Sequence, residues 1–274
     1  MKKYISTDSM QMFAFNIWSV ETANTVIRAA SCAGRDVILQ TSVKAFEFVD
    51  KEELRWAVSH SAKRSGIHAY LHLDHAENLE TIQEAVAQGW DSVMIDASGK
   101  TLEENIRLTN AVCAIAAEKN VLVETEVGRV GGSEEGVSGA MAGAARIEDI
   151  ERMIRETGAD MLAVAIGTMH GQYDGQIALQ YDLLRQTEAI SDIPVVIHGG
   201  SGLTDQTLQQ LLSYGNVKKI NISTEVKQAY REGIRESWQK GTLEKEGFDP
   251  LKTEKLIRES LTDMVMKKLR LLRG

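Results

Sequence analysis

Short runs of β-branched and aliphatic residues alternate with amphipathic segments along almost the whole chain. The runs predict eight strands, at Met12–Asn16, Val37–Thr41, Ala69–Asp74, Ser92–Asp96, Leu122–Val127, Met161–Ile166, Val195–Ile197 and Lys218–Ile222. The segments between and after them predict helices at Val20–Ala33, Lys51–Ser65, Leu79–Gln88, Leu102–Lys119, Ile147–Thr157, Tyr181–Ile190, Asp205–Tyr214 and Glu225–Gln239. In Leu102–Lys119, for example, apolar residues recur near positions i, i+3, i+4 and i+7, the spacing of one buried face.

This regular alternation predicts the fold class. Repeated βα units over the whole length favour a closed parallel sheet, so we expect an α/β chain with a (β/α)8 TIM barrel. Pro250–Leu272 predicts an extra C-terminal helix, whose apolar stripe could pack on its own barrel or on a neighbouring copy. Gly128–Ala144 is glycine-rich and predicts a long loop that closes over a site. No Pro/Ser-rich linker divides residues 1–274, so a single domain is expected.

Composition and charge narrow the class of partner. The chain has 274 residues, of which 43% are hydrophobic, enough for one large core. Its formal net charge of −8 argues against a nucleic-acid groove. No segment is apolar enough to span a membrane, and the N-terminus lacks the apolar stretch of a secretory signal. We therefore expect a cytoplasmic protein with no membrane partner. Cys32 and Cys113 lack metal-site spacing and predict free thiols.

Three histidines follow predicted strands and suggest a metal site. His75, His170 and His198 come at or just after the runs AYLHLD, MLAVAI and PVVI. Because the carboxyl ends of barrel strands converge, these residues can meet around one ion. Three neutral imidazoles with an open fourth position describe a catalytic zinc site. A lone histidine is more commonly a hydrogen-bonded core residue, but three at one predicted face favour the metal.

Carboxylates at the same strand ends add candidate chemistry. Asp74, next to the first histidine, is a candidate acid/base group. Glu124 and Glu126 occupy alternate positions of one strand, where they orient a histidine, supply an occasional metal ligand, or form a salt-bridged pair in the barrel mouth. Glu134 and Glu135 lie in the glycine-rich loop, where most glutamates are simply solvated.

Two further segments suit a phosphate group. His198–Gly202 reads HGGSG, and Asn221–Thr224 reads NIST, each at the end of a predicted strand and before a helix. Glycines let the backbone approach a ligand, and hydroxyl groups with helix N-terminal amides bind phosphate. The alternative is that Thr204 and Ser223 are plain helix caps.

Taken together, the motifs resemble those of the metal-dependent class II ketose-bisphosphate aldolases, the fructose- and tagatose-bisphosphate aldolase family. The resemblance runs from AFN at Ala14–Asn16 to FDP at Phe248–Pro250. Between them the family's motifs follow in order as LHLDH, SVMIDAS, VETEVGRVGG, AIGTMHG, HGGSG and KINISTE. Any one of these is modestly specific, whereas six in register are highly specific.

The resemblance assigns roles to individual residues. It implies Zn²⁺ held by His75, His170 and His198, with Glu126 as an alternative ligand. It implies that Asp74 handles the proton of the C4 hydroxyl and that Glu134 exchanges the C3 proton. Groups around the ketone-side phosphate, where a monovalent cation (Na⁺ or K⁺) is also expected, are Gly171, Gly199, Ser201, Asn221, Ser223 and Thr224. Residues lining the cleft are Asn16 and Ser42.

The implied reaction is reversible cleavage of a ketose 1-phosphate or 1,6-bisphosphate, of fructose or tagatose type, to dihydroxyacetone phosphate and an aldehyde through a zinc-stabilised enediolate. The strands offer no lysine in a clear pocket position, so no Schiff base is expected. Relatives that bind a second phosphate often read DPR, whereas this chain has Leu251 and then Lys252 after Asp249-Pro250. The loss of that bidentate donor keeps open a different tail, such as that of 6-deoxy-6-sulfofructose 1-phosphate.

Two other readings remain open at the level of sequence. One is a non-catalytic subunit that supports a partner aldolase, and the other is a zinc hydrolase built on a barrel. The retained candidate ligands and Asp74 disfavour the first, and the phosphate segments disfavour the second. The expected partners are a small phosphorylated sugar and further copies of the chain, as a homodimer or homotetramer.

Overall fold

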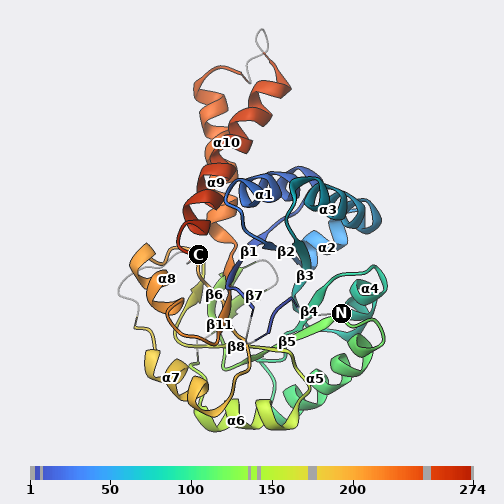
Figure 1. Ribbon diagram of the computed structural model, residues 1–274, viewed down its shortest axis with the longest axis vertical. Coiled ribbons are helices and arrows are strands. Elements are labelled where there is room, and N and C mark those ends of the chain that lie inside the picture. The colour runs from blue at the N-terminus through green and yellow to red at the C-terminus, as the bar shows by residue number, and fades with distance from the viewer. Residues whose placement is uncertain are drawn as a thin grey trace.

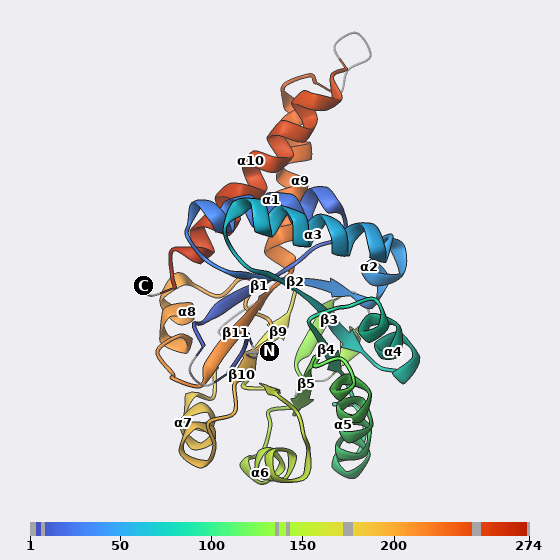
Figure 2. The ribbon, with the colours of Figure 1, turned by 45° about the vertical axis from the view of Figure 1, so that its right-hand side comes forward.

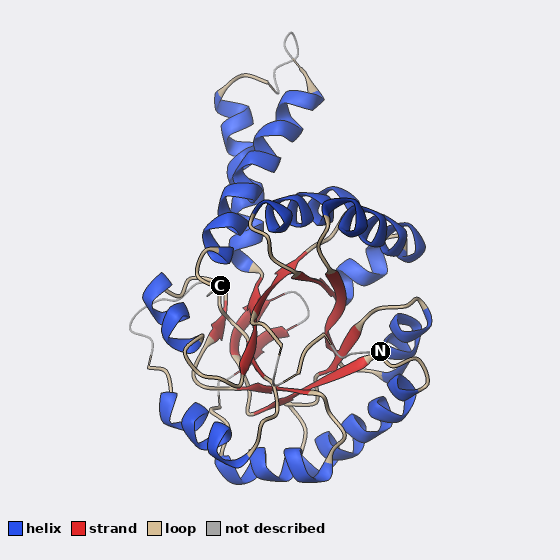
Figure 3. Ribbon diagram, in the orientation of Figure 1, coloured by secondary structure: helices blue, strands red, loops and turns tan. Residues whose placement is uncertain are grey.

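The computed structural model describes residues 4–6, 9–134, 137–140, 143–171, 178–242 and 248–272, with the backbone alone for residues 133, 134 and 137–140. Eight parallel strands form a closed barrel ringed by helices (Figure 3), in which the first strand pairs with the last. The strands are β1 (Met12–Asn16), β2 (Val37–Ser42), β3 (Ala69–Ala76), β4 (Ser92–Ile95), β5 (Leu122–Val127), β8 (Met161–Val164), β10 (Val195–Ile197) and β11 (Val217–Ile222). The predicted TIM barrel is therefore confirmed.

Helices connect successive barrel strands on the outside (Figure 1). They are α1 (Val20–Cys32), α2 (Val43–Phe48), α3 (Lys51–Ser65), α4 (Leu79–Ala87), α5 (Leu102–Ala117), α6 (Ile147–Glu156), α7 (Tyr181–Ile190), α8 (Asp205–Leu211) and α9 (Thr224–Gln239). The short α2 was not predicted, because six residues are too few to show a helical period. Its N-cap is Ser42, whose Oγ accepts a hydrogen bond from the backbone of Ala45.

The interior of the barrel divides into an apolar end and a polar end. The amino ends of the strands fill their half with apolar side chains, joined by Ile5 from the N-terminal segment: Met12, Ala14, Ile38, Leu122, Met161, Ala163 and Val196. Because side chains alternate along a strand, the next inward positions toward the carboxyl ends are polar, such as Gln40, His72 and Glu124. Candidate chemistry is thereby concentrated at one end of the barrel.

The predicted extra helix, α10 (Pro250–Leu269), packs antiparallel to α9, and together they form an arm that projects from the barrel (Figures 1 and 2). Their axes approach so closely that a Cβ at Gly233 would lie 2.4 Å from Cα of Ile257. The apolar stripe of α10 is buried within its own chain, against α9 and α1. The sequence had left that choice open.

The glycine-rich segment after β5 is more ordered than the predicted loop. It contains a hairpin of β6 (Gly131–Glu134) and β7 (Val137–Ala140), and β6 pairs in parallel with β9 (Met169–His170). The prediction of an irregular loop was wrong, because glycine-rich strands carry little β-propensity and this pairing is non-local. Among the described residues, none of the helices has the length and apolarity needed to cross a membrane.

Candidate functional site

The three histidines predicted as metal ligands lie together at the carboxyl end of the barrel. His75 is the residue before the last of β3, His170 is the last residue of β9, and His198 directly follows β10. Their ring centroids are 4.7 to 5.9 Å apart. One nitrogen of each ring lies within 4.8 Å of the others. Three distant segments therefore bring their imidazoles to one point, as the strand-end pattern predicted.

The placement of His75 depends on an irregularity in β3. The register between β3 and β4 shifts between Leu73 and Ala76, and His75 has a φ of +52°, in the left-handed region. In a regular strand Asp74 and His75 would point to opposite faces. The bulge allows both to face the barrel mouth. Such strained backbone in a non-glycine residue is typical of functional positions.

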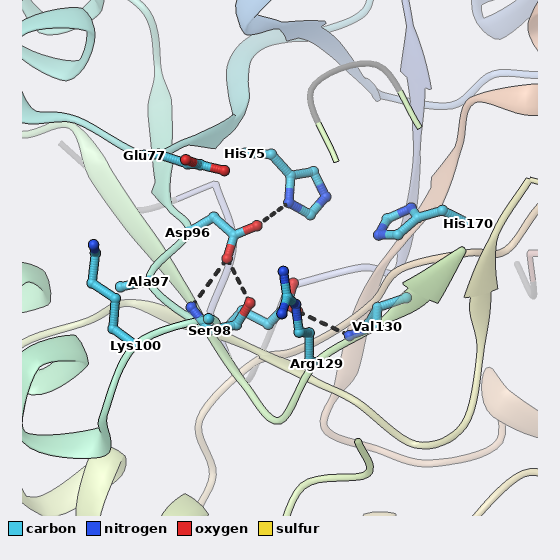
Figure 4. A pocket seen from close by; sticks show the side chains of 11 residues that line it. His75, Glu77, Asp96, Ala97, Ser98, Lys100, Arg129, Val130 and His170 are labelled. Carbon is cyan, nitrogen blue, oxygen red and sulfur yellow. Dashed lines mark hydrogen bonds and ion pairs between the residues drawn. The ribbon is translucent and has the colours of Figure 1, made fainter. Parts of the chain in front are cut away.

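His75 and His198 each hydrogen-bond a carboxylate through one ring nitrogen. Nδ1 of His75 donates to Asp96 at 2.8 Å (Figure 4), and Nε2 of His198 donates to Glu124 at 2.8 Å. A neutral imidazole carries one proton, so the second nitrogen of each ring presents a lone pair. These two nitrogens, Nε2 of His75 and Nδ1 of His198, lie only 3.0 Å apart. Two facing lone pairs require a positive charge between them, either a proton or a metal ion.

The donor set fits a divalent metal ion. Histidines that bind zinc almost always donate their other N–H to a partner such as a carboxylate, which is what His75 and His198 do. Glu126 adds an oxygen donor, since its buried Oε2 lies 3.6 Å from Nδ1 of His198 and has no hydrogen-bond partner among the described residues. Its other oxygen accepts from the backbone of Val130 at 3.2 Å. Imidazoles with a carboxylate are typical zinc ligands.

The ionisation of these groups reflects their burial and their neighbours. Burial disfavours a charge on His75, but Asp74, Asp96 and Glu126 outweigh it and raise its pKa well above the ordinary value. Burial would raise the pKa of Asp96, but His75 holds it well below its usual range. Burial, reinforced by Asp96, raises the pKa of Glu126 to about 8. Without a metal ion, the cluster therefore holds protons near neutral pH.

Asp74 lies beside the histidines within a network of amides. Its Oδ2 accepts from Nε2 of Gln40 at 2.9 Å, and its Oδ1 accepts from Nδ2 of Asn221 at 3.4 Å. Gln40 also donates to Oδ1 of Asn16 at 2.6 Å. Oδ1 of Asp74 is 4.0 Å from Nε2 of His75. The network aims a carboxylate at the face where the histidine lone pairs meet.

The predicted phosphate segments also meet at the barrel mouth. Oγ of Ser201 accepts from the backbone amides of Ser223 at 3.1 Å and Glu225 at 3.3 Å, which joins the loop after β10 to the start of α9. The buried Oγ of Ser223 and Oδ1 of Asn221 have no hydrogen-bond partner within the part of the chain that the structure describes. Thr224 is the first residue of the sixteen-residue helix α9. The hydroxyl group of Ser223 and the helix N-terminus can donate to an anionic group, whereas the amide oxygen of Asn221 can only accept, from a donor or a cation.

Glycines hold the loops of this mouth in contact with each other. Gly199 has a φ of +69°, and a Cβ there would lie 2.4 Å from the carbonyl oxygen of Met169. Gly171, with a φ of +95°, directly follows His170. Backbone therefore approaches the phosphate segment more closely than any side chain would permit.

The comparisons with known proteins agree with this geometry. The family model described as fructose-bisphosphate aldolase class-II matches residues 1–274. The chain belongs to the class II fructose-bisphosphate aldolase family. A 6-phospho-5-dehydro-2-deoxy-D-gluconate aldolase of Halalkalibacterium halodurans is 33% identical over 224 residues, which cover 81% of this chain and 77% of that protein. A fructose-bisphosphate aldolase of Staphylococcus epidermidis is 36% identical over 200 residues, covering 73% and 68%.

A solved structure gives the same result for the fold. The crystal structure of the YdjI aldolase from Escherichia coli K12 superposes with a TM-score of 0.81 at 26% identity, covering 96% of this chain and 91% of that one. As a member of an aldolase family, the chain is a lyase.

The structure places one lysine of the strands inside the barrel. Lys219, on β11, is fully buried inside the barrel, and its Nζ donates to Oε2 of Glu124 at 2.7 Å. The sequence KKINI gave no sign of this, because an isolated pair of lysines in a strand usually faces solvent. Lys219 is nevertheless not available as a nucleophile, since its Nζ forms an ion pair with Glu124. Its pairing with Glu124 disfavours a Schiff base.

A polar cavity of about 320 Å³ opens beside the histidines (Figure 4). It is bounded by His75 and His170 on one side and by residues after β4 and β5 on the other. Those residues include Ser98, which donates to Asp96 through both its backbone amide and its hydroxyl group. The cavity gives small molecules access to the histidine cluster, and Ser98 fixes the carboxylate that holds His75.

Other predicted residues have separate outcomes. The side chain of Glu134 lies outside the described part, although its backbone ends β6 next to the strand of His170. Ser42 caps α2, and Asn16 accepts a hydrogen bond from Gln40. The sequence reasoning did not select Asp96 or Gln40. Asp96 carried a signal, a carboxylate at the end of a predicted strand, whereas Gln40 was marked only by polarity at an inward position of β2.

Proposed function

We propose that this chain is a zinc-dependent class II aldolase that reversibly cleaves a phosphorylated ketose to dihydroxyacetone phosphate and an aldehyde. The observation that carries the proposal is the 3.0 Å separation between Nε2 of His75 and Nδ1 of His198, with Asp74 beside them. That arrangement calls for a cation at the point where a carboxylate can act on a substrate. The family membership sets the reaction class.

The proposed metal ligands are His75, His170 and His198, with Glu126 as an exchangeable fourth donor. When bound, Zn²⁺ supplies a Lewis acid that stabilises negative charge on the oxygens of the ketone and the adjacent hydroxyl group. Asp96 and Glu124 orient two of the imidazoles through their second nitrogens. The bulge at His75 keeps its ring at the barrel mouth.

The acid–base work falls to two carboxylates. Asp74 takes the proton of the C4 hydroxyl group as the C3–C4 bond breaks, since its donors Gln40 and Asn221 hold its carboxyl group pointed at the site. We assign proton exchange at C3 to Glu134, carried by the hairpin that pairs with the strand of His170. The charge left at C3 is spread onto the neighbouring carbonyl oxygen as an enediolate.

The ketone-side phosphate is proposed to bind at the mouth segment of Gly171, Gly199, Ser201, Asn221, Ser223 and Thr224. The support is the Oγ of Ser223, which has no partner in the described part of the chain, together with the N-terminus of α9. Oδ1 of Asn221, an acceptor without a partner among the described residues, suits a Na⁺ or K⁺ ion beside the phosphate.

The names of the relatives narrow the substrate class. One relative is named for fructose bisphosphate and the other for a 6-phospho-5-dehydro-2-deoxygluconate. Both named compounds place a ketone next to the carbon that carries a phosphate, but their far ends differ, a phosphate against a carboxylate. We propose that this chain binds the half that these compounds share, the ketone with its neighbouring phosphate. The candidate substrates, which differ at the other end, are fructose or tagatose 1,6-bisphosphate, a keto-acid phosphate, and a sulfonated ketose 1-phosphate.

A homodimer or homotetramer is proposed from the position of Leu251 and Lys252. They are the second and third residues of α10, which begins at the outer end of the arm (Figure 2). Leu251 is 78% exposed, and Nζ of Lys252 lies 3.7 Å from Asp249. We propose that this tip reaches the active site of a second copy. Neither a nucleic acid nor a membrane is among the proposed partners.

The test is turnover of the purified chain on a panel of ketoses. The panel comprises fructose and tagatose 1,6-bisphosphates, 6-phospho-5-dehydro-2-deoxygluconate and 6-deoxy-6-sulfofructose 1-phosphate, with dihydroxyacetone phosphate measured as product. We expect activity on at least one, abolished by a chelator, restored by Zn²⁺, and resistant to borohydride added with substrate. A zinc-loaded chain inactive on all four would overturn the proposal and favour the non-catalytic subunit.

A further inference from the structure

A buried ion pair lies directly beneath the histidine cluster. Nζ of Lys219 is 2.7 Å from Oε2 of Glu124, and neither side chain is exposed to solvent. The other oxygen of Glu124 accepts the hydrogen bond from Nε2 of His198 at 2.8 Å. Lys219 of β11 thus contacts Glu124 of β5, and Glu124 contacts His198, which directly follows β10 and is a proposed metal ligand.

The ion pair is not explained by the needs of the barrel core. Removing two charges from water carries a penalty of several kcal/mol per ion, and apolar residues of similar size stabilise a core at least as well. The inward positions nearer the amino ends of the strands are filled in that way, for example by Leu122 and Val196. The contacts of the ion pair instead indicate a role in holding His198.

Lys219 also limits the choices open to Glu124. Oε2 of Glu124 lies 3.6 Å from Nε2 of His72. That nitrogen has no hydrogen-bond partner in the described residues, so it offers a competing contact. The ammonium group of Lys219 holds Oε2 in place, which leaves Oε1 directed at His198. Without this clamp, the carboxylate could turn toward His72 and release the ring of His198.

We infer that Lys219 and Glu124 form a positioning pair that fixes the tautomer and ring orientation of His198, so that Nδ1 is presented to the metal ion. The inference rests on the metal site proposed above. A carboxylate can only accept at Nε2, which places the single proton of the neutral ring there and the lone pair on Nδ1. Neither residue touches the substrate, so both are positioning residues.

The experiment compares Glu124→Gln, Lys219→Met and the double variant with the wild-type chain. Each single change leaves a buried charge without its partner and is expected to lower stability. The double variant removes both charges together and is expected to fold, while its amide can either donate to or accept from Nε2 of His198. The readouts are the Zn²⁺ dissociation constant, from competition with a chromophoric chelator, and the ¹⁵N shifts of His198 in the metal-free protein.

The matched control is Thr125→Val, on the same strand and equally buried. Thr125 points away from the cluster and bonds Thr109 at 2.9 Å. We expect this variant to keep wild-type Zn²⁺ affinity. The double variant should bind Zn²⁺ about 10- to 100-fold more weakly, with a mixture of both His198 tautomers.

The outcomes separate this inference from the proposed function. A folded double variant with wild-type Zn²⁺ affinity and a single Nε2–H tautomer would overturn the inference alone, because the pair would then serve only the fold. A wild-type chain that binds no Zn²⁺ would overturn the proposed metal site, and the inference with it. Weaker Zn²⁺ binding in the double variant but not in Thr125→Val supports both.

Discussion

Gly132 of β6 pairs with His170 of β9, so closely that a Cβ at Gly132 would lie 2.1 Å from the carbonyl oxygen of His170. Gly132 also has a φ of +97°, which L side chains rarely adopt. The hairpin that carries Glu134 is therefore built onto the strand that carries a metal ligand. The hairpin and the strand of His170 therefore form one structural unit.

The first prediction is that Gly132→Ala separates the hairpin from β9. The added methyl group meets backbone rather than a flexible side chain, so one strand must shift. We expect kcat to fall roughly 100-fold, because small displacements of catalytic groups have effects of that size. The measurement is exchange of the C3 proton of dihydroxyacetone phosphate, followed by NMR.

Gly143→Ala is the matched control for this loop. Gly143 bridges to Arg129 at the base of the same segment, but a Cβ there meets nothing within 4 Å. We expect it to exchange the C3 proton at the wild-type rate. Equal rates in the two alanine variants would contradict the proposed coupling of the hairpin to His170.

The second prediction concerns Asp74. Asp74→Ala should lower the rate of ketose cleavage by roughly 100- to 10,000-fold, the usual contribution of general acid–base catalysis. Zn²⁺ content and C3 proton exchange should persist, since Asp74 is assigned to the C4 hydroxyl group. Asp91→Asn is the control, because Asp91 accepts a hydrogen bond from Leu71 before β4, at the opposite end of the barrel. Loss of C3 exchange in Asp74→Ala would assign Asp74 a different role.

Most of the barrel was predictable from sequence because local patterns determine it. The bounds predicted for β1, β5, β10, α3 and α7 agree with the structure. Each has a continuous apolar run or a clear helical period. The elements that were missed, α2 and the β6–β7 hairpin, are short or glycine-rich. Their stability comes from a cap at Ser42 and from pairing with a distant strand, neither of which leaves a periodic signal.

The site was predictable in part for a related reason. His75, His170 and His198 are marked by their position at strand ends, which converge in any barrel. Glu124 was marked as a group that could orient a histidine, and it does bond His198. Which histidine Glu124 and Asp96 each contact was not predictable, because it depends on the register between neighbouring strands. The contact of Lys219 with Glu124 spans 95 residues of sequence. Such pairs are visible only once the barrel has closed.

The third prediction is that Zn²⁺ binding at pH 7 releases protons. The pKa of Glu126 is raised to about 8 in the metal-free protein, against an ordinary 4.5, and that of His75 is raised well above its ordinary value. Both groups therefore hold a proton at pH 7 that a metal ion must displace. Calorimetric titration with Zn²⁺ in two buffers of different ionisation enthalpy counts those protons. An apparent enthalpy independent of the buffer would contradict the prediction.

The same shifts predict how the stability of the metal-free protein depends on pH. A folded-state pKa above the unfolded value means that the folded protein binds more protons, so its stability falls as pH rises. For Glu126 this loss extends from about pH 4.5 to about pH 8. The zinc-loaded protein should instead gain stability over this range, because Zn²⁺ binds the deprotonated ligands. Thermal melts of both forms between pH 5 and pH 8 test the opposite slopes.

The last prediction concerns the contact between the arm and the phosphate segment. Nζ of Lys268, buried on α10, donates to Oε1 of Glu225 at 2.8 Å, and the same oxygen accepts from the backbone amide of Gly202 at 2.8 Å. Lys268→Met leaves this carboxylate without its cation and loosens the loop after β10. Because Glu225 is partly exposed, we expect a loss of about 2 kcal/mol in the free energy of unfolding, less than for a fully buried pair.

The kinetic consequence distinguishes a loop effect from a general loss of stability. We expect KM for the phosphorylated ketose to rise in Lys268→Met, with kcat nearly unchanged, because Gly202 adjoins the proposed phosphate site and not the metal. Lys267→Met is the neighbouring control, since its exposed ammonium group lies 4.0 Å from Asp205 and should matter little. Urea unfolding and steady-state kinetics of both variants provide the measurement. Equal KM values in the two variants would show that Lys268 stabilises α10 without ordering the phosphate loop.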